Sequence, residues 1–298
     1  MTDDLRPSEQ DADQSRRFLF DDADIRGEFV QLHRSLQDLL AVHAYAPGVR
    51  KLLGEFLAAA TLLSTTLKFE GRLILQARSE GQIPLLMAEC SNELQVRAIA
   101  RGAEHATSED FAQLLAAGVL AITIEPVQGK PYQGIVPLSE HSLADSLDAY
   151  FLQSEQLQTR LWLASDGQQA AGLLLQQLPP QLHCDVEVRA QQWEHVSALA
   201  ATLTADELLQ LSPESLLYRL YHEDPVRLFN PRHVHFQCSC SLQRSRNALA
   251  AIAAHELEEI LAERGHIEVD CEFCNQQYRF ERDELQDLLL AGPDPTVH

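Results

Sequence analysis

The stretch Cys238-Ser239-Cys240 is followed, after thirty further residues, by Cys271-Glu272-Phe273-Cys274. Two close pairs of thiolates can surround one tetrahedral metal ion, and Zn²⁺ is the ordinary ion for an all-sulfur site. The second pair has the common C-x₂-C spacing, whereas the first pair, C-x-C, is one residue tighter. We therefore predict that the reduced protein holds one Zn²⁺ per chain and that its ligands are Cys238, Cys240, Cys271 and Cys274.

The spacing alone leaves two other uses of these cysteines open. They could be unrelated packing residues, or they could form a dithiol redox site without a metal. Cys90 and Cys184 lie far from the quartet in sequence, and we expect them to be ordinary packing or surface residues. His233 and His235 stand beside the quartet, but four cysteines already fill a zinc shell, so we expect these histidines to lie on the surface or to support the ligands.

Composition limits the classes of partner. The 298 residues carry a formal net charge of −21, and the segment 232–298 alone has six Lys and Arg against twelve Asp and Glu. Such acidity disfavours binding to nucleic acid, which requires clustered basic residues. The sequence lacks an apolar run of membrane-spanning length, a signal peptide and a nucleotide-binding or hydrolase motif. Cysteine pairs at metal spacing fit a reducing compartment. We expect a cytoplasmic protein that is not an enzyme and has no membrane, nucleotide or nucleic-acid partner.

The first three quarters of the chain predict an α+β fold. Residues 1–15 are polar and acidic, which is typical of a disordered leader. A core domain over 16–180 begins with helices at 26–42 and 47–67, because apolar residues recur there at helical spacing. A helix is expected from Ser142, and the double proline at 179–180 marks the end of this domain. Strands are predicted at 71–77, 83–90, 94–100, 119–124, 134–138, 160–164 and 171–178.

Residues 181–231, which we call the linker region, carry apolar stripes of helical period and predict helices without a strand. Their apolar faces need a partner, and we expect this partner to be the sheet of the core domain. Two interpretations stay open: a helical subdomain, or a docked linker whose helices are stable only while their ends are held.

The final segment, 232–298, predicts helices near 248–261 and 283–290 and short strands at 267–269 and 278–280. Its apolar residues are few, so its own core is expected to supply at most about 3–5 kcal/mol. Structural zinc contributes roughly 10–16 kcal/mol in small peptides. We therefore expect the metal to decide whether this segment folds.

Several motifs outside the cysteines are similar to those of a known protein family. Together with the C-x-C and C-x₂-C pairs, they make the chain resemble the bacterial 33 kDa heat-shock chaperones, a redox-regulated family of holdases, over nearly its full length. The motifs are Thr65-Thr66-Leu67-Lys68-Phe69-Glu70-Gly71, Tyr132-Gln133-Gly134-Ile135-Val136-Pro137-Leu138, Asp148-Ala149-Tyr150-Phe151, Ser154-Glu155-Gln156-Leu157 and Leu216-Leu217-Tyr218-Arg219-Leu220-Tyr221-His222-Glu223.

The resemblance implies a zinc-bound, inactive monomer when reduced, and a homodimer that holds unfolding client proteins without ATP when oxidised. It also implies disulfides Cys238–Cys240 and Cys271–Cys274, with Cys271 and Cys274 as the oxidant sensor and the first pair responding to unfolding. Neither bridge spans the thirty residues between the pairs, and each small ring constrains the unfolded chain by at most about 2 kcal/mol. Oxidation is therefore expected to unfold the segment and to expose the linker stripe.

Two other functions use cysteine pairs of this kind. A thiol–disulfide oxidoreductase would carry its C-x₂-C at the start of a helix, but Cys274 precedes a predicted turn and strand. A nucleic-acid-binding zinc ribbon is disfavoured by the acidic balance.

Overall fold

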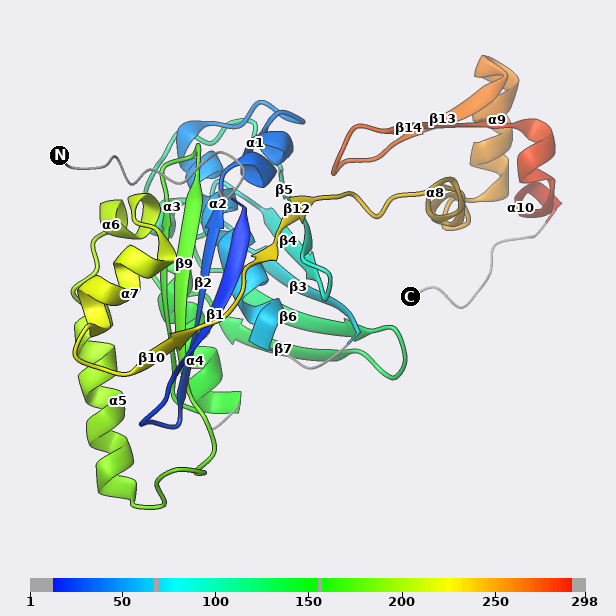
Figure 1. Ribbon diagram of the computed structural model, residues 1–298. Helices are drawn as coiled ribbons and strands as arrows, with labels where there is room; N and C mark the ends of the chain where they lie inside the picture. The colour runs from blue at the N-terminus through cyan, green and yellow to red at the C-terminus, as the bar shows by residue number, and fades with distance from the viewer. Residues whose placement is uncertain (1–12, 67–69, 155–156, 291–298) are drawn as a thin grey trace. The chain divides into compact units, whose positions relative to one another are not determined.

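The computed structural model describes residues 13–66, 70–154 and 157–290 of the chain (Figure 1). The chain divides into two compact units, which join after Gln237 and are described separately below. The predicted leader falls mostly on residues 1–12, outside the described part. The first strand begins at Gln14, so the last two residues of that leader are strand residues.

Sheet A of the first unit runs in the order β10-β1-β2-β9-β8, and β11 also pairs with β1. All its pairings are antiparallel. Its strands are β1 (Gln14–Phe20), β2 (Ile25–Leu32), β8 (Thr159–Ser165), β9 (Ala170–Gln177), β10 (Val226–Leu228) and β11 (Arg232–His233).

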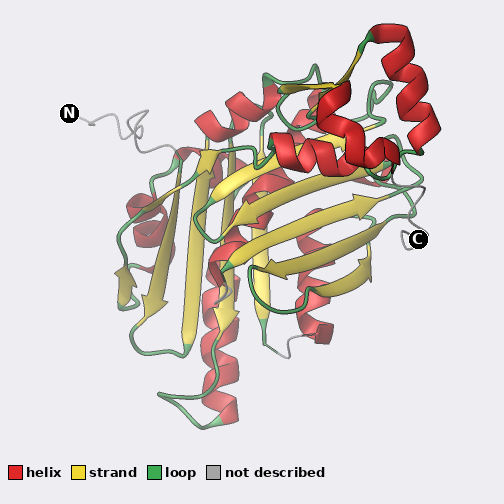
Figure 2. Cartoon of the chain, turned by 90° about the vertical axis from the view of Figure 1, so that its right-hand side faces the viewer, coloured by secondary structure: helices red, strands yellow, loops and turns green. Residues whose placement is uncertain are grey.

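Sheet B runs in the order β12-β5-β4-β3-β6-β7, and its strands lie side by side in Figure 2. The two-residue strand β12 pairs in parallel with β5, and the other pairings are antiparallel. Its strands are β3 (Gly71–Arg78), β4 (Leu85–Ser91), β5 (Gln95–Arg101), β6 (Val119–Pro126), β7 (Tyr132–Pro137) and β12 (His235–Phe236). The short helix α3 (Phe111–Leu114) lies between β5 and β6 in sequence.

Helix α2 (Pro47–Thr66) forms the centre of the core. It contacts strands of both sheets, and fifteen of its twenty residues are buried. The run Ala58-Ala59-Ala60 is fully buried, because small side chains let both sheets approach the helix. Helices α1 (Arg34–Leu40) and α4 (Leu143–Ser154) cover the rest of this core. The mixed fold predicted from the sequence is confirmed, with two sheets around one buried helix.

The predicted helix over 26–42 is wrong in its first half. Residues 25–32 form strand β2, and only Arg34–Leu40 is helical. β2 lies between β1 and β9 and is buried on both faces, so its apolar residues do not alternate with polar ones. Its apolar residues Ile25, Phe29 and Leu32 are four and three residues apart, which is also the spacing along one face of a helix.

The linker region packs on the face of sheet A that points away from α2. It contains α5 (Val186–Ala200), α6 (Ala205–Gln210) and α7 (Pro213–Tyr221). Side chains at Asp185, Thr204 and Ser212 cap the three helices by accepting backbone N–H groups. Their buried residues, Trp193 among them, form one cluster with the aromatic face of sheet A. Figure 1 shows the ribbons of α5, α6 and α7 beside this sheet. The predicted partner of these helices is therefore confirmed, whereas the expectation that no strand follows is wrong, because β10 pairs with β1.

The second unit is small. It contains helices α8 (Leu242–Leu249), α9 (Ala254–Arg264) and α10 (Gln286–Leu290), the 3₁₀ turn η1 (Arg282–Leu285), and the hairpin of β13 (His266–Asp270) and β14 (Gln277–Glu281). The predicted helix over 248–261 is instead two helices, which are separated at residues 250–253. The first residues of the predicted zinc segment, 232–236, form β11 and β12 in the first unit.

Candidate functional site

The four cysteines of the two motifs meet in the second unit. Their sulfur atoms all lie within 4.8 Å of one another, and the four residues are half-buried. Cys238 Sγ lies 3.6 Å from Cys271 Sγ, and Cys240 Sγ lies 3.5 Å from Cys274 Sγ. Each close contact therefore joins one cysteine of the C-x-C motif to one of the C-x₂-C motif.

Local backbone geometry places the second pair. Cys271 and Cys274 lie in the turn that joins β13 to β14, and the Cys271 carbonyl accepts hydrogen bonds from the backbone N–H groups of Cys274 and Asn275 at 3.2 and 2.7 Å. Asn275 has a φ of 55°, a left-handed conformation that asparagine tolerates better than most residues. The Sγ atoms of Cys271 and Cys274 accept the backbone N–H groups of Phe273 and Gln276.

Side chains support the first pair. The Tyr278 hydroxyl donates a hydrogen bond to Cys240 Sγ at 3.1 Å, and this bond raises the pKa of the phenol to about 12. Arg244, in α8, donates to the carbonyl and hydroxyl oxygens of Ser239 at 2.9 and 2.7 Å. The guanidinium group thus fixes the residue between the two cysteines.

The donor set fits a tetrahedral ion. With Zn–S bonds of about 2.3 Å, the sulfur atoms of a zinc site are about 3.8 Å apart, close to the two contacts above. Burial raises the pKa of the Cys271 and Cys274 thiols, and a bound cation would reverse that effect because it requires thiolates. The four cysteines are therefore positioned to hold a metal ion.

A second polar arrangement fastens the linker region to sheet A. The side chain of Asp24, which is 6% exposed, accepts hydrogen bonds from the backbone N–H groups of residues 181–183. It also forms an ion pair with Arg189, in which Asp24 Oδ2 lies 2.8 Å from a guanidinium nitrogen. Burial alone would raise the pKa of Asp24, but these donors hold it below its usual value. Further along, Gln31 Nε2 donates to the Leu211 carbonyl at 2.8 Å, and Arg16 pairs with Glu214.

The comparisons with known proteins agree with this architecture. A family model described as Hsp33 protein matches residues 13–281. The 33 kDa chaperonin of Pseudomonas paraeruginosa is 51% identical over 294 residues, covering 96% of this chain and 99% of its own length. That of Azotobacter vinelandii is 52% identical over 297 residues, covering 97% and 99%.

The chain belongs to the Hsp33 family. It is therefore a member of a chaperone family, as the sequence motifs predicted. The crystal structure of the 33 kDa chaperonin of Thermotoga maritima shares its fold, with a TM-score of 0.77 at 24% identity over 93% of this chain and 97% of that one. Among the residues that the structure describes, no helix is long and apolar enough to cross a membrane.

The other candidate residues of this Hsp33 chain lie elsewhere. His233 and His235 are exposed on β11 and β12, and the potential metal group in the described residues comprises the four cysteines alone. Cys90 is fully buried on β4, which raises the pKa of its thiol to about 12, whereas Cys184 is exposed just before α5. Both placements agree with the packing and surface roles expected for them.

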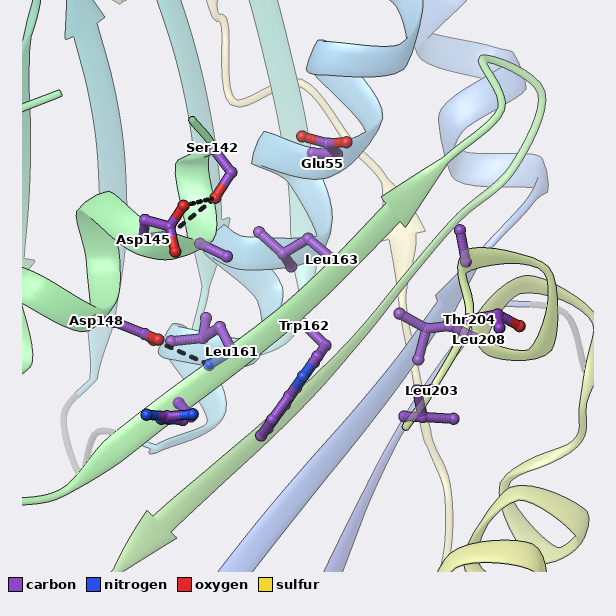
Figure 3. A pocket seen from close by; sticks show the side chains of 13 residues that line it. Glu55, Ser142, Asp145, Asp148, Leu161, Trp162, Leu163, Leu203, Thr204 and Leu208 are labelled. Atoms are coloured by element: carbon purple, nitrogen blue, oxygen red, sulfur yellow. Dashed lines mark hydrogen bonds between the residues drawn. The ribbon is translucent and has the colours of Figure 1, made fainter. Parts of the chain in front are cut away.

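The Hsp33 chain also has a cavity of about 360 Å³ beside the linker region (Figure 3). Its walls come from α2, α4 and β8 on one side and from residues 203–208 of the linker on the other. Glu55 and Asp148 line it, and burial raises the pKa of each carboxyl to about 7. Asp148 accepts the backbone N–H of Leu161 at 3.0 Å.

Sequence reasoning missed several of these residues. Tyr278, Arg244 and Asp24 are polar or aromatic residues in ordinary local contexts. The partners of Tyr278 and Asp24 are more than thirty residues away, whereas Arg244 contacts Ser239, five residues before it. Tyr278 lies four residues after Cys274, which places it near the motif but does not reveal which sulfur it contacts. For Asp24, the sequence carried no signal that we can identify.

Proposed function

We propose that this chain is a redox-regulated holdase that needs no ATP. Reduced and zinc-bound, it is inactive; oxidation of Cys238, Cys240, Cys271 and Cys274 opens its client-binding surface. The observation that carries the proposal is the convergence of four sulfur atoms in a unit with little other core. Zn²⁺, when bound, supplies a cross-link between two chain segments thirty residues apart.

The oxidative step uses the thiolates themselves. One sulfur attacks a peroxide oxygen and becomes a sulfenic acid as the O–O bond breaks and hydroxide leaves. The neighbouring thiolate then attacks that sulfur, so that an S–S bond forms and a second hydroxide leaves. Two thiolates, one H₂O₂ and two protons from solvent thus give one disulfide and two waters. Two such steps form Cys271–Cys274 and Cys238–Cys240 and leave no thiolate for the ion.

The second unit is expected to unfold once its ion is lost. Its buried apolar cluster contains six residues, namely Leu249, Leu257, Leu261, Ile267, Phe280 and Leu285. Burial of a cluster of this size stabilises the folded unit by only a few kcal/mol, because most of the gain is offset by the conformational entropy that the chain loses on folding. The two disulfides would each close a ring of three or four residues and would not replace the long-range clamp.

The linker region transmits the change. It is connected to Cys238 through β10, β11 and β12, which are only three, two and two residues long. Such short strands add few hydrogen bonds, so loss of the folded unit at Cys238 would let them separate from the sheets in turn. The linker helices would then be held by their own packing and by polar contacts such as those of Asp24, Gln31 and Arg16.

Release of the linker would create the client surface. The face of sheet A under α5 and α7 carries Phe18, Phe20 and Phe29, all buried by the linker region. An exposed apolar face of this kind binds the apolar segments of unfolding proteins. We propose that these rings and the linker stripe hold clients. We also propose that the chain works in the cytoplasm, where it is a reduced monomer until oxidative stress converts it to an oxidised homodimer.

A light-scattering assay tests the proposal. The reduced, metal-loaded chain is treated with peroxide at mild heat and added to a client that aggregates on dilution from denaturant. We expect one zinc per reduced chain, its release in step with loss of four thiols, and suppression of client aggregation by the oxidised chain alone. Size-exclusion chromatography with scattering detection reports the change from monomer to dimer.

The matched controls are Cys90→Ser and Cys184→Ser, which should keep both zinc and redox control. Cys271→Ser should lose them. Client protection by the reduced, zinc-loaded chain, or no protection after full oxidation, contradicts the redox proposal. Turnover in an insulin-reduction assay would instead favour an oxidoreductase.

A further inference from the structure

The two cysteine pairs differ in what supports their sulfur atoms. In the C-x₂-C pair, Phe273 and Gln276 supply backbone N–H donors to the sulfurs, because the turn after Cys271 is long enough to fold back on them. In the C-x-C pair, Cys240 Sγ accepts a hydrogen bond from the Tyr278 side chain at 3.1 Å. A thiolate can only accept hydrogen bonds, so the phenol must be the donor.

The position of Tyr278 ties this donor to the other pair. Tyr278 is the second residue of β14, and Cys271 and Cys274 lie in the turn that connects β13 to β14. Figure 1 shows this hairpin. Phe280, two residues on, is buried in the core of the second unit and therefore fixes the face of the strand on which Tyr278 lies. The hydroxyl reaches Cys240 only while this hairpin keeps its register.

We propose that Tyr278 is a positioning residue that couples the two cysteine pairs. This inference rests on the redox function proposed above. While the hairpin is intact, the Tyr278 hydrogen bond holds the Cys240 sulfur in place and draws electron density from it, which makes that sulfur a poorer nucleophile. Formation of the Cys271–Cys274 disulfide strains the turn at the start of β14 and withdraws the hydroxyl. Cys240 then reacts with Cys238 and the oxidant as described above.

The substitution Tyr278→Phe tests the coupling, because it removes the hydroxyl and keeps the ring. Full-length, zinc-loaded chain is pulsed with hydrogen peroxide at 25 °C, quenched by alkylation and cleaved after arginine. The fragments 233–244 and 265–279 each carry one cysteine pair, so mass spectrometry follows the two oxidations separately. Zinc affinity is measured in parallel by competition with a chelator, and Tyr218→Phe, an exposed tyrosine of the linker, is the matched control.

In the parent chain we expect 265–279 to oxidise before 233–244. In Tyr278→Phe, oxidation of 233–244 should be about tenfold faster without waiting for the other pair, and zinc affinity should fall roughly 10–100-fold, the usual effect of losing a hydrogen bond to a metal ligand. The rate for 265–279 should not change. Far-ultraviolet circular dichroism of the zinc-loaded variant verifies that it is folded.

Three outcomes overturn the inference. Unchanged rates and affinity would mean that the hydroxyl does not act on Cys240. If both cysteine pairs oxidise faster by the same factor in Tyr278→Phe, the Tyr278 hydroxyl stabilises the second unit as a whole and does not couple the two pairs. Oxidation of 233–244 first in the parent chain would contradict the proposed order. If the parent chain instead keeps its zinc while its thiols oxidise, the redox function itself fails, which is a separate result.

Discussion

The ring of Phe18 lies directly over Gly27. The two residues face each other in the β1–β2 ladder, and a Cβ atom added at Gly27 would lie 1.9 Å from Phe18 Cζ. The missing side chain lets the ring lie against the strand. Tyr221 of α7 packs beside it, with ring centroids 6.5 Å apart. The fit of the linker region on sheet A therefore depends on a glycine in the neighbouring strand.

Gly27→Ala should loosen the linker without any oxidant. The added methyl group must displace the Phe18 ring, and overpacking of this kind usually costs about 1–3 kcal/mol. Because the ring supports α7, we expect faster proteolysis within 181–231 and increased binding of an apolar dye by the reduced, zinc-loaded chain.

The double variant Gly27→Ala with Phe18→Leu provides the control. The smaller side chain makes room for the methyl group, so the two effects should be less than additive in a double-mutant cycle. Strict additivity would show that the alanine acts elsewhere than on Phe18.

Asp24→Asn should weaken the anchor at the start of the linker. The neutral amide loses the ion pair with Arg189 and accepts the N–H groups of residues 181–183 less strongly, at a cost of about 1.5–3 kcal/mol. Urea unfolding and hydrogen exchange at residues 181–189 measure the loss. Asp22→Asn, an exposed neighbour, is the matched control and should change neither.

The Asp24 anchor should also depend on pH. Its folded pKa lies below the usual value of 3.8, so its stabilisation is fully present above that pH and is lost as the pH falls through the folded value. The difference in unfolding free energy between the parent chain and Asp24→Asn should therefore shrink below about pH 3.8. A difference that stays constant with pH would contradict a role for the carboxylate charge.

Glu55 should make the chain less stable as the pH rises, which is the opposite of the effect of Asp24. Burial in the cavity raises its pKa from 4.5 to about 7, so the folded chain keeps a proton between these values that the unfolded chain has lost. The contribution of Glu55 to the free energy of unfolding therefore falls by up to about 3 kcal/mol as the pH rises from 4.5 to about 7. Glu55→Gln should therefore stabilise the chain at pH 8 and have little effect at pH 4.

Thermal unfolding of Glu55→Gln and the parent chain at the two pH values measures this difference. Glu109→Gln, an exposed glutamate, is the control, and its effect should not follow the same pH window. Equal melting temperatures for Glu55→Gln and the parent chain at pH 8 would contradict a buried, ionised Glu55.

Thiol reactivity should follow burial. Cys184 is exposed, so it should react with an alkylating reagent in the native, zinc-loaded chain, whereas Cys90 is fully buried with a raised pKa and should not. We expect one rapidly modified thiol per chain and four more after chelation of the metal. Mass spectrometry identifies them, and early modification of Cys90 would place β4 outside the core.

Much of the fold was predictable from local pattern. The strands β3 to β9 and the hairpin of β13 and β14 follow runs of apolar residues bounded by turn residues, and their bounds agree with prediction to within about two residues. The central strand β2 was mistaken for a helix because burial on both faces removes the alternation that identifies a strand. The strand β1 and the short strands β10 to β12 were missed, because their pairing with distant strands, not their own sequence, makes them strands.

The sequence by itself determined the four cysteines, their grouping in two pairs and their segregation in a thin C-terminal segment. These features depend on spacing and composition, which are local. Only the tertiary structure decided that the linker region covers the aromatic face of sheet A, that Asp24 and Gln31 fasten it there, and that Tyr278 reaches Cys240. Each of these relationships joins residues that are distant in the chain, and their partners are chosen by how the sheets and helices pack.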